Sequence, residues 1–164
     1  IRCEGDFELE ILALPPADTP SPTGSSPPSP PTPTAPPVPG LCPLISAVPV
    51  NYELDGVVVV SGTTEGGVAN LPGPGETCSN QASPTFWYKI EIAADDLTLV
   101  ATSCTDDTTF DTTLTIFQEL DEATCDYVCL GRNDDHGLST ADLCSLTTHS
   151  FIAVEGLLAG TYYI

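Results

Sequence analysis

A proline-rich tract near the N-terminus divides the chain into unequal parts. Residues 15–39 read PPADTPSPTGSSPPSPPTPTAPPVP, in which Pro, Ser and Thr make up almost everything. Proline has no backbone N–H and a fixed φ, so such a tract favours polyproline II over helix or sheet. No hydrophobic core can form there. The sequence therefore predicts three parts: an N-terminal segment at 1–14, a linker at 15–40, and one folded domain at 41–164.

The linker carries many hydroxyl groups. A stiff, extended tract of about 25 residues, at roughly 3.1 Å per residue, spans on the order of 75 Å. Ser and Thr interleaved with Pro in a secreted protein are typical of an O-glycosylated stalk, and an unmodified flexible linker is the alternative. The sites predicted to carry O-linked glycans are Thr19, Ser21, Thr23, Ser25, Ser26, Ser29, Thr32 and Thr34.

Composition limits the compartment and the partners. Three Lys and Arg stand against 23 Asp and Glu, and this formal net charge of -20 opposes binding to nucleic acid or to anionic membrane surfaces. No apolar run approaches the roughly 20 residues of a membrane helix, so we expect no membrane insertion. Seven cysteines in a chain with few cations and no Met indicate an oxidising, extracellular environment.

The cysteines favour disulfide bonds over a zinc site. Cys125 and Cys129 have a spacing that zinc accepts, yet no second close pair of Cys or His follows them. We expect each disulfide bond to join neighbours in sequence order, so that Cys3 is left as the odd thiol. The predicted pairs are Cys42–Cys78, Cys104–Cys125 and Cys129–Cys144.

Short apolar runs predict an all-β domain. Phe86–Ile92 (FWYKIEI) alternates with the period of two of a half-buried strand, and Thr109–Phe117 (TFDTTLTIF) reads as a buried strand. We expect these two runs to be partners at the centre of a sheet. Gly- and Pro-rich turns separate further short strands, which indicates a sandwich or a barrel. Those strands are expected at 56–62, 97–103, 150–154 and 160–164.

The segment before the linker also has a strand pattern. Residues 7–14, FELEILAL, place Phe7, Leu9 and Ile11 on one face and two glutamates on the other. Helix is the alternative, because Glu, Leu and Ala favour it, but so short a helix is marginal in water. We predict a strand that follows a turn at Gly5.

The sequence contains no recognised catalytic motif, and we expect no enzyme. It lacks the G-x-S-x-G, H-E-x-x-H, phosphate-loop and dinucleotide fingerprints, and neither His136 nor His149 has a neighbour in sequence that indicates catalysis. Acidic side chains in two loops suit calcium, although their spacing matches no EF-hand and such residues are ordinary turn formers. The chain requires no cofactor on this reading. The candidate calcium ligands are Asp106, Asp107, Asp111, Asn133, Asp134 and Asp135.

The order of several motifs resembles a known family. GVVVVSGTT comes first, and then Cys78 before FWYKI, LVATSC, TFDTTLTIF, a Cys-flanked NDD loop, SFIAVEG and GTYYI. Over roughly residues 41–164 this resembles the bacterial pre-peptidase C-terminal domain. The resemblance implies a jelly-roll-type β-sandwich, here braced by disulfides, that acts as a non-catalytic accessory or adhesive module and is sometimes associated with calcium.

The same resemblance implies a closing strand of the pattern G-x-F-x-L-x-I after GTYYI, where this chain stops at Ile164. That pattern stands instead at the N-terminus, as Gly5, Phe7, Leu9 and Ile11. We therefore expect a detached N-terminal strand that forms a hairpin with the 160–164 strand of a neighbouring copy and completes its domain. The residues predicted at this inter-subunit contact are Cys3, Phe7, Leu9, Ile11, Tyr162 and Ile164.

These features lead to one expected function and one alternative. Head-to-tail strand complementation does not close on itself, so copies of the chain would form an extracellular filament or surface fibre. Folding back of the strand onto its own domain remains open, as does whether neighbours are separate chains or repeats of one polypeptide. The alternative function is a binding module of a secreted hydrolase or adhesin.

Overall fold

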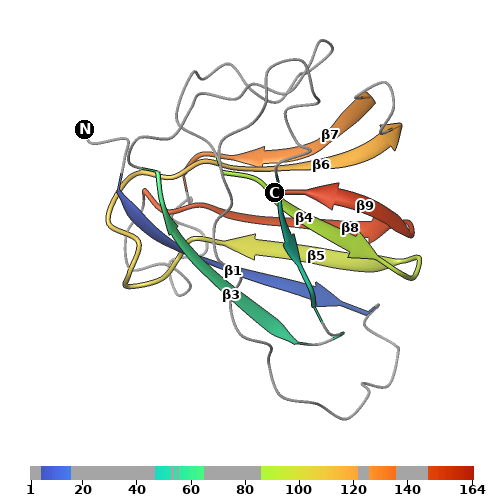
Figure 1. Ribbon diagram of the computed structural model, residues 1–164, viewed down its shortest axis with the longest axis horizontal. Coiled ribbons are helices and arrows are strands. Elements are labelled where there is room, and N and C mark those ends of the chain that lie inside the picture. The colour runs from blue at the N-terminus through green and yellow to red at the C-terminus, as the bar shows by residue number, and fades with distance from the viewer. Residues whose placement is uncertain are drawn as a thin grey trace.

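A computed structural model shows an all-β molecule built from two sheets (Figure 1). The residues that it describes are 5–15, 47–52, 54, 56–64, 86–121, 126–135 and 148–164. Within these ranges the chain forms nine strands and no helix. The strands are β1 Asp6–Leu14, β2 Val48–Val50, β3 Val57–Thr63, β4 Tyr88–Ile92, β5 Leu97–Thr102, β6 Leu114–Asp121, β7 Asp126–Asn133, β8 Phe151–Leu157 and β9 Gly160–Tyr163.

The first sheet has four strands in the order β3-β1-β5-β8. All of its pairs are antiparallel. The second sheet has five strands in the order β2-β4-β9-β6-β7, and there only the β2–β4 pair is parallel. Strands that are neighbours in space are mostly distant in sequence, so the fold depends on long-range pairing.

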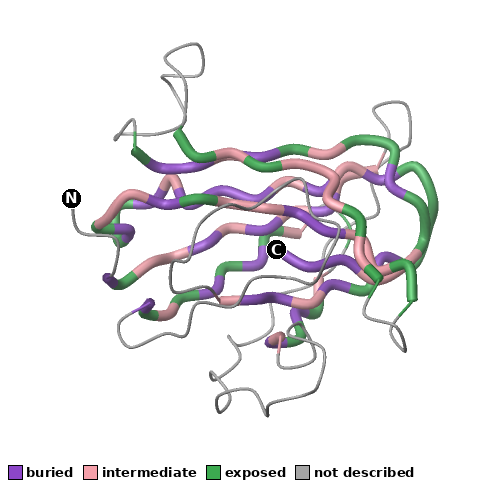
Figure 2. Tube along the Cα trace, turned by 90° about the horizontal axis from the view of Figure 1, so that it is seen from above, coloured by how far each residue is buried: buried purple, intermediate pink, exposed green. Residues whose placement is uncertain are grey.

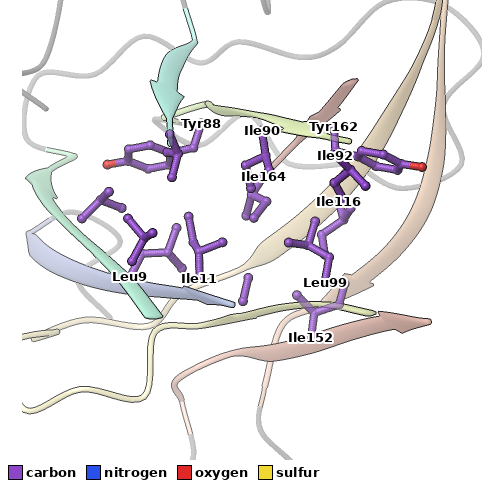
Figure 3. Packing of buried hydrophobic residues seen from close by; sticks show 14 of the residues in the cluster. Leu9, Ile11, Tyr88, Ile90, Ile92, Leu99, Ile116, Ile152, Tyr162 and Ile164 are labelled. Carbon is purple, nitrogen blue, oxygen red and sulfur yellow. The ribbon is translucent and has the colours of Figure 1, made fainter. Parts of the chain in front are cut away.

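The core lies between the two sheets. Buried residues alternate with more exposed ones along the strands, as the colours of the tube in Figure 2 show. Leu9 and Ile11 of β1 face Ile90 and Ile164 across the space between the sheets (Figure 3). Such alternation arises because successive strand residues point to opposite faces of a sheet. The predicted β-sandwich is therefore confirmed.

A second, smaller cluster lies on the other face of the five-stranded sheet. Trp87, Phe117 and Tyr163 are buried together, while Tyr162 and Ile164, the neighbours of Tyr163 in sequence, belong to the main core. The Trp87 and Phe117 rings meet edge to face, with centroids 5.5 Å apart. These aromatic side chains therefore stabilise the sheet from outside and form no exposed binding platform.

The period-two segments fold as predicted, but one boundary is wrong. The N-terminal segment is a strand and not a helix, and strands occupy the other predicted segments to within a few residues. The run at 109–117 becomes a strand only at Leu114. Before it, the Thr112 N–H donates to the carbonyl of Thr148 (3.1 Å), and the Thr112 hydroxyl bonds that of Ser103 (2.6 Å). These bonds hold Thr112 in a loop instead of a sheet ladder.

The predicted pairing of 86–92 with 109–117 is also wrong. Strand β9 lies between β4 and β6, where Tyr163 is opposite Lys89 on one side and Phe117 on the other. Both runs have the period of a strand, but that period says nothing about which strand is the neighbour. The C-terminal strand β9 therefore occupies the position where the sequence predicts direct contact between β4 and β6.

Within this single chain, β1 is not detached. It is an inner strand of the four-stranded sheet, next to β3 and β5 (Figure 1). The predicted hairpin with residues 160–164 is wrong as well, because β9 pairs with β4 and β6 in the other sheet. The physical reason is that the apolar face of β1 closes the core opposite β9 instead of extending its sheet.

Candidate functional site

The candidate site is the place that β1 occupies between β3 and β5, which we call the β1 slot. Because the residues of β1 alternate between its two faces, one face is turned to the core. Leu9, Ile11 and Ala13 lie on that face and are at most 3% exposed. The Phe7 ring packs at 6.0 Å from the ring of Phe86. These side chains bury apolar area in the core, and this burial favours filling of the slot by a strand of this sequence.

The backbone of β1 is hydrogen-bonded on both edges. Pairing with β3 runs from Asp6 opposite Thr63 to Leu12 opposite Val57, and pairing with β5 runs from Glu10 opposite Thr102 to Leu14 opposite Thr98. In the described strand order, β3 neighbours β1 alone. Without β1 the sheet would lose its connection to β3 and expose two unpaired edges, which readily accept another strand.

The beginning of β1 is hydrogen-bonded to Thr64 and lies close against the turn that follows β5. The Thr64 N–H donates to the Gly5 carbonyl (2.9 Å), and the Gly5 N–H donates to the Thr64 hydroxyl (3.0 Å). A Cβ atom added at Gly5 would lie 3.0 Å from Cδ1 of Phe110 and 3.1 Å from Oγ1 of Thr109. A residue with a side chain would therefore be crowded at this position.

A threonine side chain replaces the missing β5 ladder beside the first half of β1. The Thr108 hydroxyl accepts from the Glu8 N–H (3.2 Å) and donates to the Glu8 carbonyl (3.1 Å). Thr108 is 2% exposed and also bonds the hydroxyl of Thr105 at 3.1 Å. Both polar groups of the Glu8 backbone are thus satisfied by one side chain from a turn that follows β5.

The outer side of the slot is acidic. Partial burial raises the pKa of the Glu8 carboxyl above its ordinary value, and the negative charges of Asp107 and Glu10 raise it further. Repulsion between these carboxylates opposes the docking of β1 at neutral pH. The apolar inner face of β1 therefore provides the attraction that holds the strand in the sheet.

The other residues predicted at the inter-subunit contact have different places. Tyr162 and Ile164 belong to β9 and its end, and they reach the same core from the opposite sheet. The Ile164 N–H donates to the Tyr88 carbonyl (3.0 Å), and the Tyr88 N–H donates to the Ile164 carbonyl (2.9 Å). Their backbones are therefore used within the five-stranded sheet. Cys3 lies outside the described residues.

The disulfide and glycosylation predictions fall largely outside the described residues. Cys104 and Cys129 are each disulfide-bonded, and neither bond can be assigned to a partner from the described ranges. The other predicted disulfide cysteines (42, 78, 125 and 144) and all eight predicted glycosylation sites lie outside the described residues, so these stay predictions.

The acidic residues proposed for calcium are only partly brought together. Partial burial raises the pKa of Asp111, and the nearby charges of Asp135 and Asp134 raise it further. Asp107 instead lies near Glu8 of β1. Across the described ranges, no group of three or more His, Cys, Asp or Glu side chains is arranged to hold a metal ion. Calcium binding stays a prediction.

Two of the proposed ligands have structural partners. Asp134 accepts from Arg132 at 3.2 Å and from the hydroxyl of Thr113. The Asn133 side-chain oxygen accepts from the Phe151 N–H at 3.3 Å, which ties the end of β7 to the start of β8. These side chains contribute to the local structure whether or not a metal is bound.

The sequence missed the residues that hold the start of β1. The partners of Gly5 and Glu8 are Thr64 and Thr108, and no local pattern connects positions 59 and 100 residues apart. The run of threonines in TDDTTF was the one available signal, because closely spaced threonines can bond a neighbouring backbone.

His149 is a buried group with no role in the slot. It is 1% exposed, and neither of its ring nitrogens has a hydrogen-bond partner. No helix long and apolar enough to cross a membrane occurs in the part of the chain that the structure describes. No family model, curated protein or solved structure matches the chain.

Proposed function

We propose that this chain is a non-enzymatic structural subunit of an extracellular filament or surface fibre. In it, β1 of one copy fills the β1 slot of the next, so that sandwiches follow one another head to tail. The observation that carries this proposal is that an inner strand of the sandwich, β1, is separated from every other described strand by the proline-rich linker.

Contacts in the slot are the same whichever copy supplies β1. Leu9, Ile11 and Ala13 would fill the same core positions, and the pairing with β3 and β5 would be unchanged. The choice therefore depends on the linker, through the effective concentration at which it presents its own strand. A linker with the polyproline II conformation that its sequence predicts would resist bending back on itself, which favours a neighbouring slot.

The composition supports an extracellular fibre. O-linked glycans on the linker, predicted at Thr19 to Thr34, would stiffen and solubilise a spacer between sandwiches. Disulfide bonds would brace a domain of modest size against unfolding when β1 exchanges. The formal net charge of -20 would oppose the lateral association of assembled sandwiches. A fibre of this kind needs no cofactor, and its partners are copies of itself.

A chain that accepts a strand but cannot donate one tests the proposal. In the double variant Leu9→Asp, Ile11→Asp, the inner face of β1 carries two charges that the core cannot hold. Added to the wild-type chain, it should occupy growing ends and shorten filaments in proportion to its share, as seen by negative-stain electron microscopy. The control is Leu12→Ser on the outer face of β1, which should leave filament length unchanged.

The outcomes separate the two functions. Filaments that shorten with the double variant but not with the control support strand complementation. A wild-type chain that stays monomeric at every concentration contradicts it and favours the accessory or binding module instead. If the double variant does not change filament length, the proposed role of β1 is contradicted, and the filaments must be assembled through another contact.

A further inference from the structure

We infer that the turn at residues 105–110, together with Thr64, is a register clamp that lets the β1 slot accept only a strand beginning Gly-Asp-Phe-Glu, namely residues 5–8 of a second copy of this chain. The inference rests on the proposed function, because it names what makes strand exchange specific. The residues of the clamp lie outside the strand that it selects.

The clamp is needed because one wall of the slot is short. Strand β5 pairs with β1 only as far as Glu10, so the stretch from Gly5 to Leu9 has no ladder on that side. The turn after β5 takes over there, with Thr108 bonded to both backbone groups of Glu8 and the Thr109 N–H donating to the Asp6 carbonyl at 3.4 Å. A shift of β1 by two residues would offer the same turn the backbone groups of Asp6 or Glu10. These bonds therefore hold the edge of β1, and the choice of register depends on the side chains that the turn crowds.

Gly5 makes the clamp selective. A shift of β1 by one residue would place Glu4 or Asp6 beside the Phe110 ring, where an added Cβ atom would lie 3.0 Å from Cδ1. The same shift would turn Leu9 and Ile11 away from the core, since side chains alternate between the faces. A shift by two would restore the faces but put Cys3 or Phe7 in the place of Gly5. The clamp therefore excludes the shift that the apolar pattern alone would allow.

The inference predicts which residue of the acceptor meets Leu12. In the observed register Leu12 is opposite Val57 on β3 and Val100 on β5. A shift by two residues would move it opposite Val59 on β3. Crosslinks from position 12 therefore report the register, and mixed isotopes report which copy supplied the strand.

The experiment uses full chains that carry a photoreactive benzoylphenylalanine at position 12. Equal amounts of ¹⁴N- and ¹⁵N-labelled chains are assembled, irradiated and mapped by mass spectrometry, with an unchanged clamp, with Phe110→Ala and with Phe110→Tyr. Alanine removes the ring that would crowd a side chain at position 5. Tyrosine keeps the ring and is the matched control.

With the clamp intact, we expect crosslinks to residues 57 and 100. Phe110→Ala should raise the share of crosslinks to residues shifted by two at least about fivefold, because the overpacking that a side chain would cause at position 5 is relieved. Phe110→Tyr should keep the first pattern. Far-UV circular dichroism checks that each variant keeps its strands.

Two failures are distinguishable. If Phe110→Ala leaves the crosslinked residues unchanged, or if Phe110→Tyr shifts them as much as Phe110→Ala does, the clamp is contradicted whichever copy donates the strand. If every crosslinked pair is isotopically pure, the strand comes from the same chain and the proposed function is contradicted, while the register still reports on the clamp.

Discussion

Three inward-facing side chains of β1 determine how much the strand contributes to the sandwich. Ile11 is fully buried among core residues from both sheets, whereas its neighbour Leu12 lies half-buried on the outer face. Burial of this kind scales with the apolar area removed from water. The strength of strand docking is therefore concentrated on one face of a single short segment.

Truncation at these two positions should have unequal effects. Ile11→Ala should lower the free energy of unfolding by about 2–5 kcal/mol, because it leaves a cavity in the core. Leu12→Ala, the matched control, should lower it by about 1 kcal/mol or less. Urea unfolding followed by tryptophan fluorescence measures both. Equal losses would mean that β1 does not lie in the core as described.

Tyr88 should make the domain sensitive to alkali. Burial raises the pKa of Tyr88 to about 12 from an ordinary value of 10.0. The unfolded chain then loses this proton first, so stability is fully present below pH 10 and falls as the pH rises from 10 to 12. The loss at pH 12 should be about 2–3 kcal/mol. Urea unfolding at several pH values should show this slope, and Tyr88→Phe should flatten it; an unchanged slope would contradict the assignment.

At the scale of elements, β3 shows how each strand divides its residues between core and surface. Val58 and Val60 are buried, while Val57 and Val59 are 43% and 40% exposed on the outer face. In the described strand order β3 is thus an edge strand that carries apolar residues on its outer face.

Lysine substitutions on β3 should test this division. Val59→Lys faces Glu10 across the β3–β1 pair and should be neutral or stabilise the domain by up to about 1 kcal/mol. Val60→Lys buries an unpaired ammonium group and should abolish folding or destabilise it by several kcal/mol. Thermal unfolding of the two variants is the measurement. A tolerated Val60→Lys would contradict the facing of β3.

Sequence patterns predicted which segments form strands better than they predicted which strands pair with each other. Alternation in FELEILAL and in FWYKIEI correctly identified β1, β4 and their inner faces, because a period of two is a local property. It could not predict that β9 separates β4 from β6, or that β1 lies beside β3 and β5, since those pairings join distant segments. Thr109 to Thr113 read as strand because threonine favours strands, but Thr112 uses its hydroxyl to bond Ser103.

In the candidate site, too, local patterns were predicted and long-range pairing was not. Leu9 and Ile11 were predicted as the contact residues from their pattern, and the structure places both in the core. Tyr162 was predicted as their strand partner and is instead in the opposite sheet. Thr108 was not predicted at all, because its bond to Glu8 spans 100 residues of sequence.

At the scale of the whole molecule, a sandwich that takes an inner strand from beyond a long linker can be completed by its own chain or by a neighbour. The contacts are equal in the two cases, so linker stiffness and concentration decide between them. The proposed fibre is the outcome in which the neighbour supplies the strand. Every repeat would then contain one sandwich and one proline-rich spacer.

The path of the linker in the assembled material tests this account most directly. A cryo-electron microscopy map that resolves the backbone should show density leaving Leu14 at the end of β1 in one sandwich and reaching Val48 at the start of β2 in the next. Density that returns from Leu14 to Val48 of the same sandwich throughout the map would contradict strand complementation between copies.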